Sequence, residues 1–414
     1  MKESSRVQSI RGSRAIRLLA VGVLAIGISS AAWAKPPPHA MNDGFKFGVL
    51  GDHRGDNKAS NVNSTKDGYK DGGMNKAVLA NLAAALRQEG VDFVLDVGDL
   101  ATKWTAPMIS ITPDALMTSE LAEWAAIWNA NSAALPIFPV RGNQEVSASV
   151  SVWTDWISSM PGIGSLAPNG PPGEEMLTYS FKRRNCLFVG IDQYLPPGNN
   201  DTHVISQAAL DWLEGQLPQS GHKFVFGHAP AFEVWDPKAA TSFTAVKDGL
   251  ASPYASFTPD YMAMRDRFWN LLGQRKAEYF CGHDHIYARA LCVDSAGRWA
   301  GQTIIGNGGA PPPALFSTAY TRGPFAEAYA GIPFPTLNAP PDPVYMLEFR
   351  RVETESMPLF SVGEPPKVTQ TYGFGYVVVT VHGSWVTAKY MAEPAANASF
   401  IEVESWAIVE GAEP

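Results

Sequence analysis

Short apolar runs alternate with segments of helical period along the first two thirds of the chain. Phe45, Phe47 and Val49 alternate with other residues ahead of a glycine, which is typical of a β-strand. Residues 78–86 repeat apolar side chains at the i, i+4, i+7 and i+8 positions of one helical face. The same reasoning predicts strands at residues 93–97, 135–140, 186–191, 224–226 and 279–281, and helices around residues 121–128, 208–217 and 262–272. Strands that alternate with helices in this way predict a largely parallel or mixed sheet with helices outside.

Helical patterns largely disappear after residue 286. Strand-like runs follow at residues 303–305, 345–349, 376–381 and 385–390, and we expect them to form a second sheet that packs on the first. The pattern therefore predicts an α/β fold in which two sheets lie between helical layers. We find no linker between domains and expect a single domain over residues 45–410.

Residues 306–343 are rich in Gly, Pro and aromatic residues and have no clear period. Loops of this length are usually functional or disordered. We interpret the segment as a surface loop near the functional site, with a mobile insertion that has no function as the alternative.

Polar residues stand directly after several of the predicted strands. They are Asp52, Asp99, Asn143, His228, His283 and His285. Strand ends of an open α/β sheet meet at the rim where ligands bind, and the glycine before each turn permits a close approach of the backbone. Carboxylates, a carboxamide oxygen and imidazoles together suit borderline divalent ions such as Mn, Fe, Co or Zn. We therefore predict a metal site at this rim.

The N-terminus has the features of a targeting segment. Five basic residues precede an apolar run over residues 18–28, and Ala32, Trp33 and Ala34 supply the small, any, small pattern of a signal-peptidase site. We predict a signal peptide over residues 1–34 with cleavage after Ala34, then a Pro-rich lead over residues 35–44, and a periplasmic or secreted protein. An uncleaved anchor is the alternative, although the run is shorter than the ~20 residues that span a bilayer.

Charge disfavours nucleic acid as a partner. The full chain carries a net charge of -8, and removal of five basic residues and one acidic residue with the leader leaves -12. That is the wrong sign for a grip on phosphate backbones, so a secreted nuclease is disfavoured. We expect no stable membrane insertion after cleavage, because no later stretch is long and apolar enough.

Three cysteines are too few for a disulfide framework. Cys186, Cys281 and Cys292 each lie in an apolar, strand-like run. We expect buried thiols, with a bridge from Cys281 to Cys292 as the alternative.

Glycine-bounded motifs recur in a fixed order along the predicted strands. They read GDHRG (51–55), GDL (98–100), GNQE (142–145), GHAP (227–230) and GHDH (282–285). Each motif alone is an ordinary turn, but the ordered series resembles the metallophosphoesterase superfamily, which includes calcineurin, purple acid phosphatases and class III cyclic nucleotide phosphodiesterases. The resemblance covers roughly residues 45–310 and implies a four-layer αββα sandwich.

The resemblance also implies a centre of two divalent ions. Asp99 would bridge them, with Asp52 and His285 on the first ion and with Asn143, His228 and His283 on the second. Two cations held ~3.5–4 Å apart activate a hydroxide for in-line attack on a phosphoryl group. The function expected is hydrolysis of a small phosphomonoester or phosphodiester.

Two positions depart from the pattern of this superfamily. Arg54 stands where a histidine is usual, and it cannot ligate a metal, although its fork suits a phosphate. Gln144 stands where a histidine usually protonates the leaving group, and an amide cannot donate a proton usefully. With Asp99, these residues are the candidate catalytic group. The departures also motivate an alternative, a catalytically impaired relative that acts as a metal-binding module.

Four neighbouring residues carry further expectations. We expect His53 to point away from the metals, and we name His53 and His203 as alternative acids. Asp284 has the position of a hydrogen-bond acceptor for a ligating histidine, but we expect it to face solvent. Thr102 stands where purple acid phosphatases carry a tyrosine ligand, so a tyrosinate–iron colour is not expected.

Overall fold

A computed structural model describes most of the chain. The described residues are 44–55, 73–102, 112–195, 203–218, 220–231, 259–294, 298–310, 344–352, 374–393 and 398–409. The signal peptide, its cleavage after Ala34, nearly all of the Pro-rich lead and residues 311–343 of the predicted loop lie outside these ranges, and they stay predictions, as does the single domain. Among the described helices, none is both long and apolar enough to cross a membrane.

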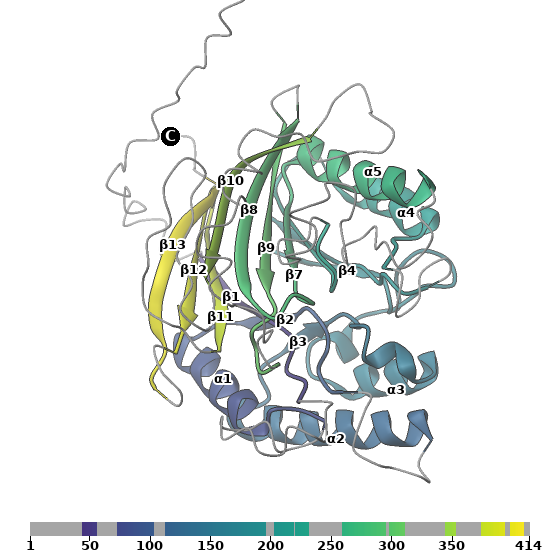
Figure 1. The fold of residues 1–414 in the computed structure, drawn as a ribbon, viewed down its shortest axis with the longest axis vertical. Coiled ribbons are helices and arrows are strands. Elements are labelled where there is room, and N and C mark those ends of the chain that lie inside the picture. The colour runs from purple at the N-terminus through teal and green to yellow at the C-terminus, as the bar shows by residue number, and fades with distance from the viewer. Residues whose placement is uncertain are drawn as a thin grey trace, which may run out of the picture.

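Two mixed β-sheets form the centre of the molecule (Figure 1). The first has the order β13-β12-β11-β1-β2-β3, with β1 (Phe45–Leu50), β2 (Phe93–Asp96), β3 (Ile137–Pro139), β11 (Gly375–His382), β12 (Trp385–Ala392) and β13 (Ile401–Val409). The second has the order β10-β8-β9-β7-β6-β5-β4, with β4 (Tyr179–Arg183), β5 (Cys186–Gly190), β6 (His222–Phe226), β7 (Glu278–Cys281), β8 (Tyr287–Asp294), β9 (Trp299–Ile305) and β10 (Val344–Val352). Parallel pairing joins β1, β2 and β3 in one sheet and β5, β6, β7 and β9 in the other.

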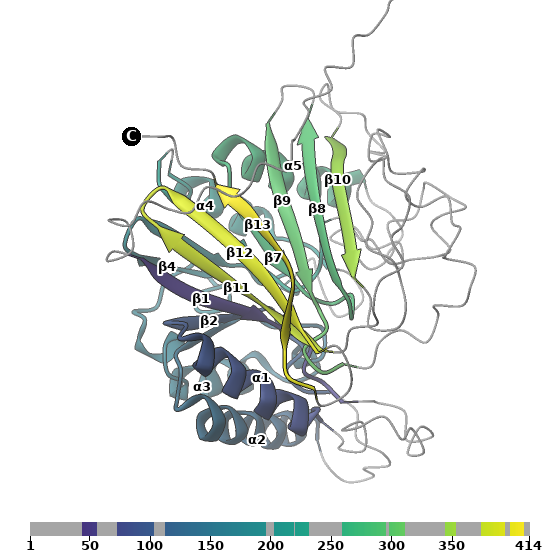
Figure 2. The same cartoon turned by 90° about the vertical axis from the view of Figure 1, so that its left-hand side faces the viewer.

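Helices cover both outer sides of the two sheets (Figures 1 and 2). Three lie on the side of the first sheet, namely α1 (Lys76–Glu89), α2 (Pro113–Ser132) and α3 (Val150–Ser159), and two lie on the side of the second, namely α4 (Gln207–Gln216) and α5 (Pro259–Arg275). Two 3₁₀ turns, η3 (Glu145–Ser147) and η4 (Ile163–Ser165), flank α3. The predicted α/β sandwich is thereby confirmed.

Local sequence explains how α1 is placed. The Asn75 side chain accepts a hydrogen bond from Val78 N at the start of the helix, and Gly90 ends it in the left-handed conformation. A Cβ on Gly48 of β1 would lie 2.5 Å from Leu86 Cδ2. The glycine therefore lets α1 pack closely on the sheet.

Aromatic side chains fill the space between the sheets. The Phe47 ring on β1 lies with its centroid 5.1 Å from that of Phe188 and 5.0 Å from that of Phe224. Phe93 on β2 lies 5.2 Å from Phe188. All four rings are buried, so this cluster ties the first sheet to the second.

We expected the C-terminal strands to form the second sheet by themselves, and this is wrong. They are divided between the two sheets. Strand β11 pairs antiparallel with β1 and brings β12 and β13 into the first sheet, whereas β8, β9 and β10 belong to the second. The alternation of apolar and polar residues along a strand defines which face of the sheet each side chain takes. It does not define which other strand pairs with it. Helix α3 and strands β4, β8 and β13 were not predicted.

The alternative of a bridge from Cys281 to Cys292 is wrong. Cys281 is a free, buried thiol, and its Sγ lies 3.8 Å from Thr303 O on the neighbouring strand. Cys186 is also buried and free, as expected for small apolar side chains.

Candidate metal centre

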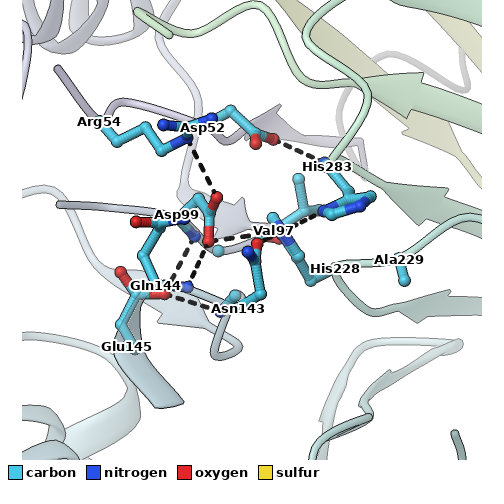
Figure 3. A network of polar contacts seen from close by, with 12 residues as sticks. Asp52, Arg54, Val97, Asp99, Asn143, Gln144, Glu145, His228, Ala229 and His283 are labelled. Carbon is cyan, nitrogen blue, oxygen red and sulfur yellow. Dashed lines mark hydrogen bonds and ion pairs between the residues drawn. The ribbon is translucent and has the colours of Figure 1, made fainter. Parts of the chain in front are cut away.

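All six predicted ligands lie in loops that leave the carboxyl ends of parallel strands. Asp52 follows β1, Asp99 follows β2, Asn143 follows β3, His228 follows β6, and His283 and His285 follow β7. These strand ends meet at one rim of the sandwich, and Figure 3 shows five of the six side chains gathered there with Arg54. The structure therefore brings the predicted residues together.

The backbone of this rim is strained where the site needs it. Asp52, Asp99 and His283 have φ angles of 59°, 54° and 70°, which non-glycine residues rarely adopt. A Cβ on Gly142 would lie 2.2 Å from Asp99 Oδ1, and one on Gly282 would lie 2.2 Å from Asp52 Oδ2. The turns are thus shaped to bring two carboxylates close to the neighbouring backbone.

His228 presents a lone pair to the centre of the cluster. Its Nδ1 lies 2.7 Å from Val97 O, and because a carbonyl only accepts, Nδ1 carries the proton. Burial lowers the pKa of His228, so the ring is neutral and its Nε2 is unprotonated. A backbone acceptor that fixes the ring in this way is the usual arrangement for a metal-ligating histidine.

The atoms that face His228 Nε2 are also rich in lone pairs. His283 Nδ1 and Asn143 Oδ1 each lie 3.2 Å away, and Asp99 Oδ1 lies 3.5 Å away. Burial, together with the neighbouring histidines, lowers the pKa of His283 well below its ordinary value. Without a cation the Asn143 amide would gain by turning its Nδ2 toward Asp99 Oδ2, 3.1 Å away. The orientation with Oδ1 inward is the one a divalent ion requires, so this set of atoms fits such an ion.

The two carboxylates complete the donor set. Asp52 Oδ2 accepts a hydrogen bond from His283 N (2.9 Å), whereas Asp52 Oδ1 is buried without a hydrogen-bond partner among the described residues. Donor atoms of Asp52, Asp99 and His228 lie within 4.8 Å of one another. Burial and then the charge of Asp99 raise the pKa of Asp52, a cost that a bound cation would offset.

Arg54 lies inside the site, between two predicted ligands of the first ion. Its Nη2 donates to His285 Nε2 (3.2 Å), and its Nε lies 3.4 Å from Asp99 Oδ2. The side chain is 16% exposed, so it borders the opening of the site. His285 Nε2 also lies 3.6 Å from Asp52 Oδ1.

Gln144 also lies beside the carboxylate of Asp99. Its backbone N donates to Asp99 Oδ1 (2.9 Å), and its side-chain Oε1 accepts from Thr102 Oγ1 (3.3 Å). Both side chains are buried. The backbone N–H of Gln144 therefore helps to hold Asp99, whereas its side-chain amide offers no acidic proton.

The two alternative acids are placed differently. His53 is buried between Asp96 Oδ2 (2.9 Å) and Gly308 O (3.0 Å), which confirms that it points away from the ligands and makes it wrong as an acid for a substrate. His203 is buried with its ring centroid 4.6 Å from that of His283. Of the two, only His203 lies at the cluster.

The expectation that Asp284 faces solvent is wrong. The residue is only 3% exposed, between His283 and His285. A Cβ on Gly306 would lie 1.8 Å from Asp284 O, so the segment after β9 packs directly on this turn.

The start of the Gly-rich segment after β9 is part of the site wall. Gly308 N donates to Gly51 O (3.0 Å), and Ala310 N donates to Asp52 O (2.7 Å). Residues 306–310 are all buried, so this part is not the surface loop we expected, although it is near the site.

Sequence reasoning missed Glu145, which shapes the loop that carries Asp99. Its carboxylate accepts from four backbone N–H groups, those of Asp99 (3.1 Å), Leu100 (2.9 Å), Ala101 (3.3 Å) and Gly142 (2.7 Å). Burial and the charge of Asp99 raise the pKa of Glu145 to about 8. The signal was its place in the GNQE motif, where a buried acid follows the ligand by two residues.

Gln193 was missed as well, and it holds the loop of His228. Its Oε1 accepts from His228 N (2.9 Å) and Ala229 N (2.6 Å), and its Nε2 donates to Tyr279 Oη (2.8 Å). It lies just after β5, at the same rim as the ligands. A polar residue after a predicted strand was the available signal.

Comparison with known proteins identifies the family and the fold of the chain. The family model of the calcineurin-like phosphoesterases matches residues 45–287. Among solved structures, PhoD aligns with a TM-score of 0.50 at 14% identity, over 87% of this chain and 69% of that chain. A dimetal phosphatase from Danio rerio aligns with a TM-score of 0.48 at 14% identity, over 88% of this chain and 98% of that chain. No curated protein matches.

The fold and the cluster define an α/β sandwich with a rim whose side chains suit a metal ion. The chain belongs to the calcineurin-like phosphoesterase family, because the family model spans more than half of its length. The resemblance inferred from the motifs is thereby confirmed.

Proposed function

We propose that this protein is an exported, metal-dependent phosphoesterase that hydrolyses a small phosphomonoester or phosphodiester. The observation that carries the proposal is the cluster of carboxylate, carboxamide and imidazole side chains around His228 Nε2, which Asp99, Asn143 and His283 supply. Side chains of these three kinds, held this close together, suit a divalent ion. Export rests on the signal peptide predicted at residues 1–34.

The donor set suits Mn, Fe, Zn or Co, and membership of the family supports phosphoester chemistry. A divalent ion, when bound, supplies Lewis acidity that lowers the pKa of water and neutralises phosphoryl charge. Arg54, partly exposed at the opening, has the geometry to bind phosphoryl oxygens through its N–H fork. The negative charge of the chain argues against nucleic acid as the substrate.

Gln144 sets the range of substrates. Because the amide cannot protonate a departing alkoxide, the protein favours esters whose leaving group is already a weak base. We expect aryl esters to be hydrolysed much faster than alkyl esters of similar size.

The test is hydrolysis of p-nitrophenyl phosphate and bis(p-nitrophenyl) phosphate with Mn²⁺ added, beside an Asp99→Asn control. Turnover that the wild-type chain shows and the variant lacks supports the proposal. The competing candidate is a metal-binding module without catalysis, which Gln144 favours. Bound metal with no turnover of either ester would establish that candidate instead.

A further inference from the structure

A guanidinium group lies where the family resemblance places the first metal ion. The resemblance assigns Asp52, Asp99 and His285 to that ion. In the structure, Arg54 Nη2 donates to His285 Nε2 over 3.2 Å, and Arg54 Nε lies 3.4 Å from Asp99 Oδ2. Two of the three assigned ligands therefore already face a positive group.

The contact with His285 is the most informative. A ring nitrogen that accepts an N–H uses the lone pair that a metal ion would need. Arginine does not lose its proton in proteins, so the contact cannot be relieved by deprotonation. An ion at His285 Nε2 would have to displace the guanidinium of Arg54.

Charge balance points the same way. Asp52 and Asp99 are the carboxylates among the predicted ligands. Of the other nearby acids, Asp96 binds His53, Glu145 binds four backbone N–H groups, and Asp284 is not a predicted ligand. One divalent ion with Arg54 already exceeds the two negative charges by one. A second divalent ion would add two more positive charges to a buried site, where repulsion is poorly screened.

We infer that this chain binds one divalent ion and that the Arg54 guanidinium takes the place of the other. The ion is held on the His228 side of the site by Asp99, Asn143, His228 and His283. Arg54 supplies a fixed positive charge that holds Asp99 and faces the opening. The inference rests on the proposed function and adds the stoichiometry of its metal centre.

The test is the manganese content of the full chain after equilibrium dialysis against excess Mn²⁺, with the electron paramagnetic resonance spectrum of the same sample. One Mn²⁺ per chain, with the spectrum of an isolated ion, is the result expected. Two Mn²⁺ per chain with a coupled spectrum would overturn the inference.

Matched variants separate the two sides of the site. Arg54→His replaces the guanidinium by a potential ligand, and we expect the content to rise from one Mn²⁺ to two. We expect the His285→Ala variant to keep the single ion. We expect Asn143→Ala to weaken binding of that ion by at least ~10-fold, because loss of a residue that only orients a ligand already has an effect of this size. Loss of the ion from the His285→Ala variant would contradict the inference.

Failure of the inference and failure of the proposed function are distinguishable. A chain that binds one ion and hydrolyses no phosphoester supports the inference and contradicts the function. A chain that binds two ions and turns over p-nitrophenyl phosphate contradicts the inference and leaves the function standing.

Discussion

Several single residues hold the predicted metal ligands without being predicted ligands themselves. The Gln193 side chain accepts hydrogen bonds from the backbone N–H groups of His228 and Ala229. The Glu145 carboxylate accepts from the backbone N–H of Asp99 and from its neighbours. Outer contacts of this kind decide whether donor atoms are in place before an ion arrives. Substitution of these residues should therefore lower metal affinity while the fold is kept.

Replacement of Gln193 by Ala should weaken Mn²⁺ binding by about 10–100-fold, because His228 loses the amide that fixes its backbone. The dissociation constant is measured by isothermal titration calorimetry. Gln207→Ala is the matched control, since that glutamine is exposed on α4 and, within the described part of the chain, its side chain donates to Asp211 on its own helix. Equal Mn²⁺ affinities of the two variants would show that Gln193 does not hold the metal site in place.

Metal affinity should fall as pH falls, and carboxylates should be the cause. The raised pKa of Asp52 means that a proton stays on this group well above pH 3.8 and competes with the ion. The lowered pKa values of His228 and His283 mean that these rings stay neutral below pH 6.5 and do not compete there. Calorimetry in buffers of different ionisation enthalpy counts the protons released on binding. Proton release that an Asp52→Asn variant leaves unchanged would contradict this assignment.

The predicted ligands could be identified from sequence because five of them directly follow a glycine at the end of an apolar run, and His285 lies two residues after His283. Glu145 and Gln193 were not, because a buried polar residue reveals its partners only when the backbone of distant loops is placed. Asp284 was misjudged for the same reason, since the segment that covers it begins at Gly306.

At the scale of elements, the turns after β2 and β3 carry the chemistry. Gly142 lets the Asn143 loop pass within contact distance of Asp99, and η3 directs Glu145 back beneath both. The two loops therefore form one unit. The geometry of this unit depends on the absence of a side chain at Gly142.

Gly142→Ala should disrupt this unit. The added methyl meets Asp99 Oδ1 and the Asp99 backbone, which lowers the free energy of unfolding by about 1–3 kcal/mol and displaces the carboxylate. We expect Mn²⁺ binding to be lost. Urea unfolding and metal analysis of the same preparation measure both effects.

Gly215→Ala on α4 is the control for that change. No described atom lies within 4 Å of its Cβ position, and the site is helical, so the change is neutral or stabilises by up to ~1 kcal/mol. If the Gly142→Ala variant has the stability of this control and normal metal content, the close approach of Gly142 to Asp99 is unimportant.

The existence and order of most elements followed from the alternation of apolar runs and helical faces. The sheet to which β11–β13 belong did not, because pairing depends on contacts between residues far apart in sequence. Helix α3 carried a usable pattern in Trp153, Trp156 and Ile157, which are buried on one face.

At the scale of the whole molecule, the site is a seam between two sheets. Asp52, Asp99 and Asn143 come from the first sheet, and the histidines come from the second. The aromatic core around Phe47 holds these halves in register. Metal binding and sheet packing are therefore linked.

Phe47→Ala should lower the free energy of unfolding by about 3–5 kcal/mol, because it opens a cavity between the sheets. Metal should recover part of this loss, since it binds across the same seam. Thermal unfolding with and without Mn²⁺ measures both effects. Val150→Ala, at a side chain 41% exposed, is the control and should change stability little. Equal stability of the two variants would contradict this view of the core.

The most direct test of the central claim is the initial rate of p-nitrophenyl phosphate hydrolysis by the full chain as Mn²⁺ is titrated into metal-free protein. We predict a rate that rises from background, saturates with the binding isotherm and returns to background on chelation. No hydrolysis at saturating Mn²⁺, or a rate unchanged by the chelator, would contradict the account.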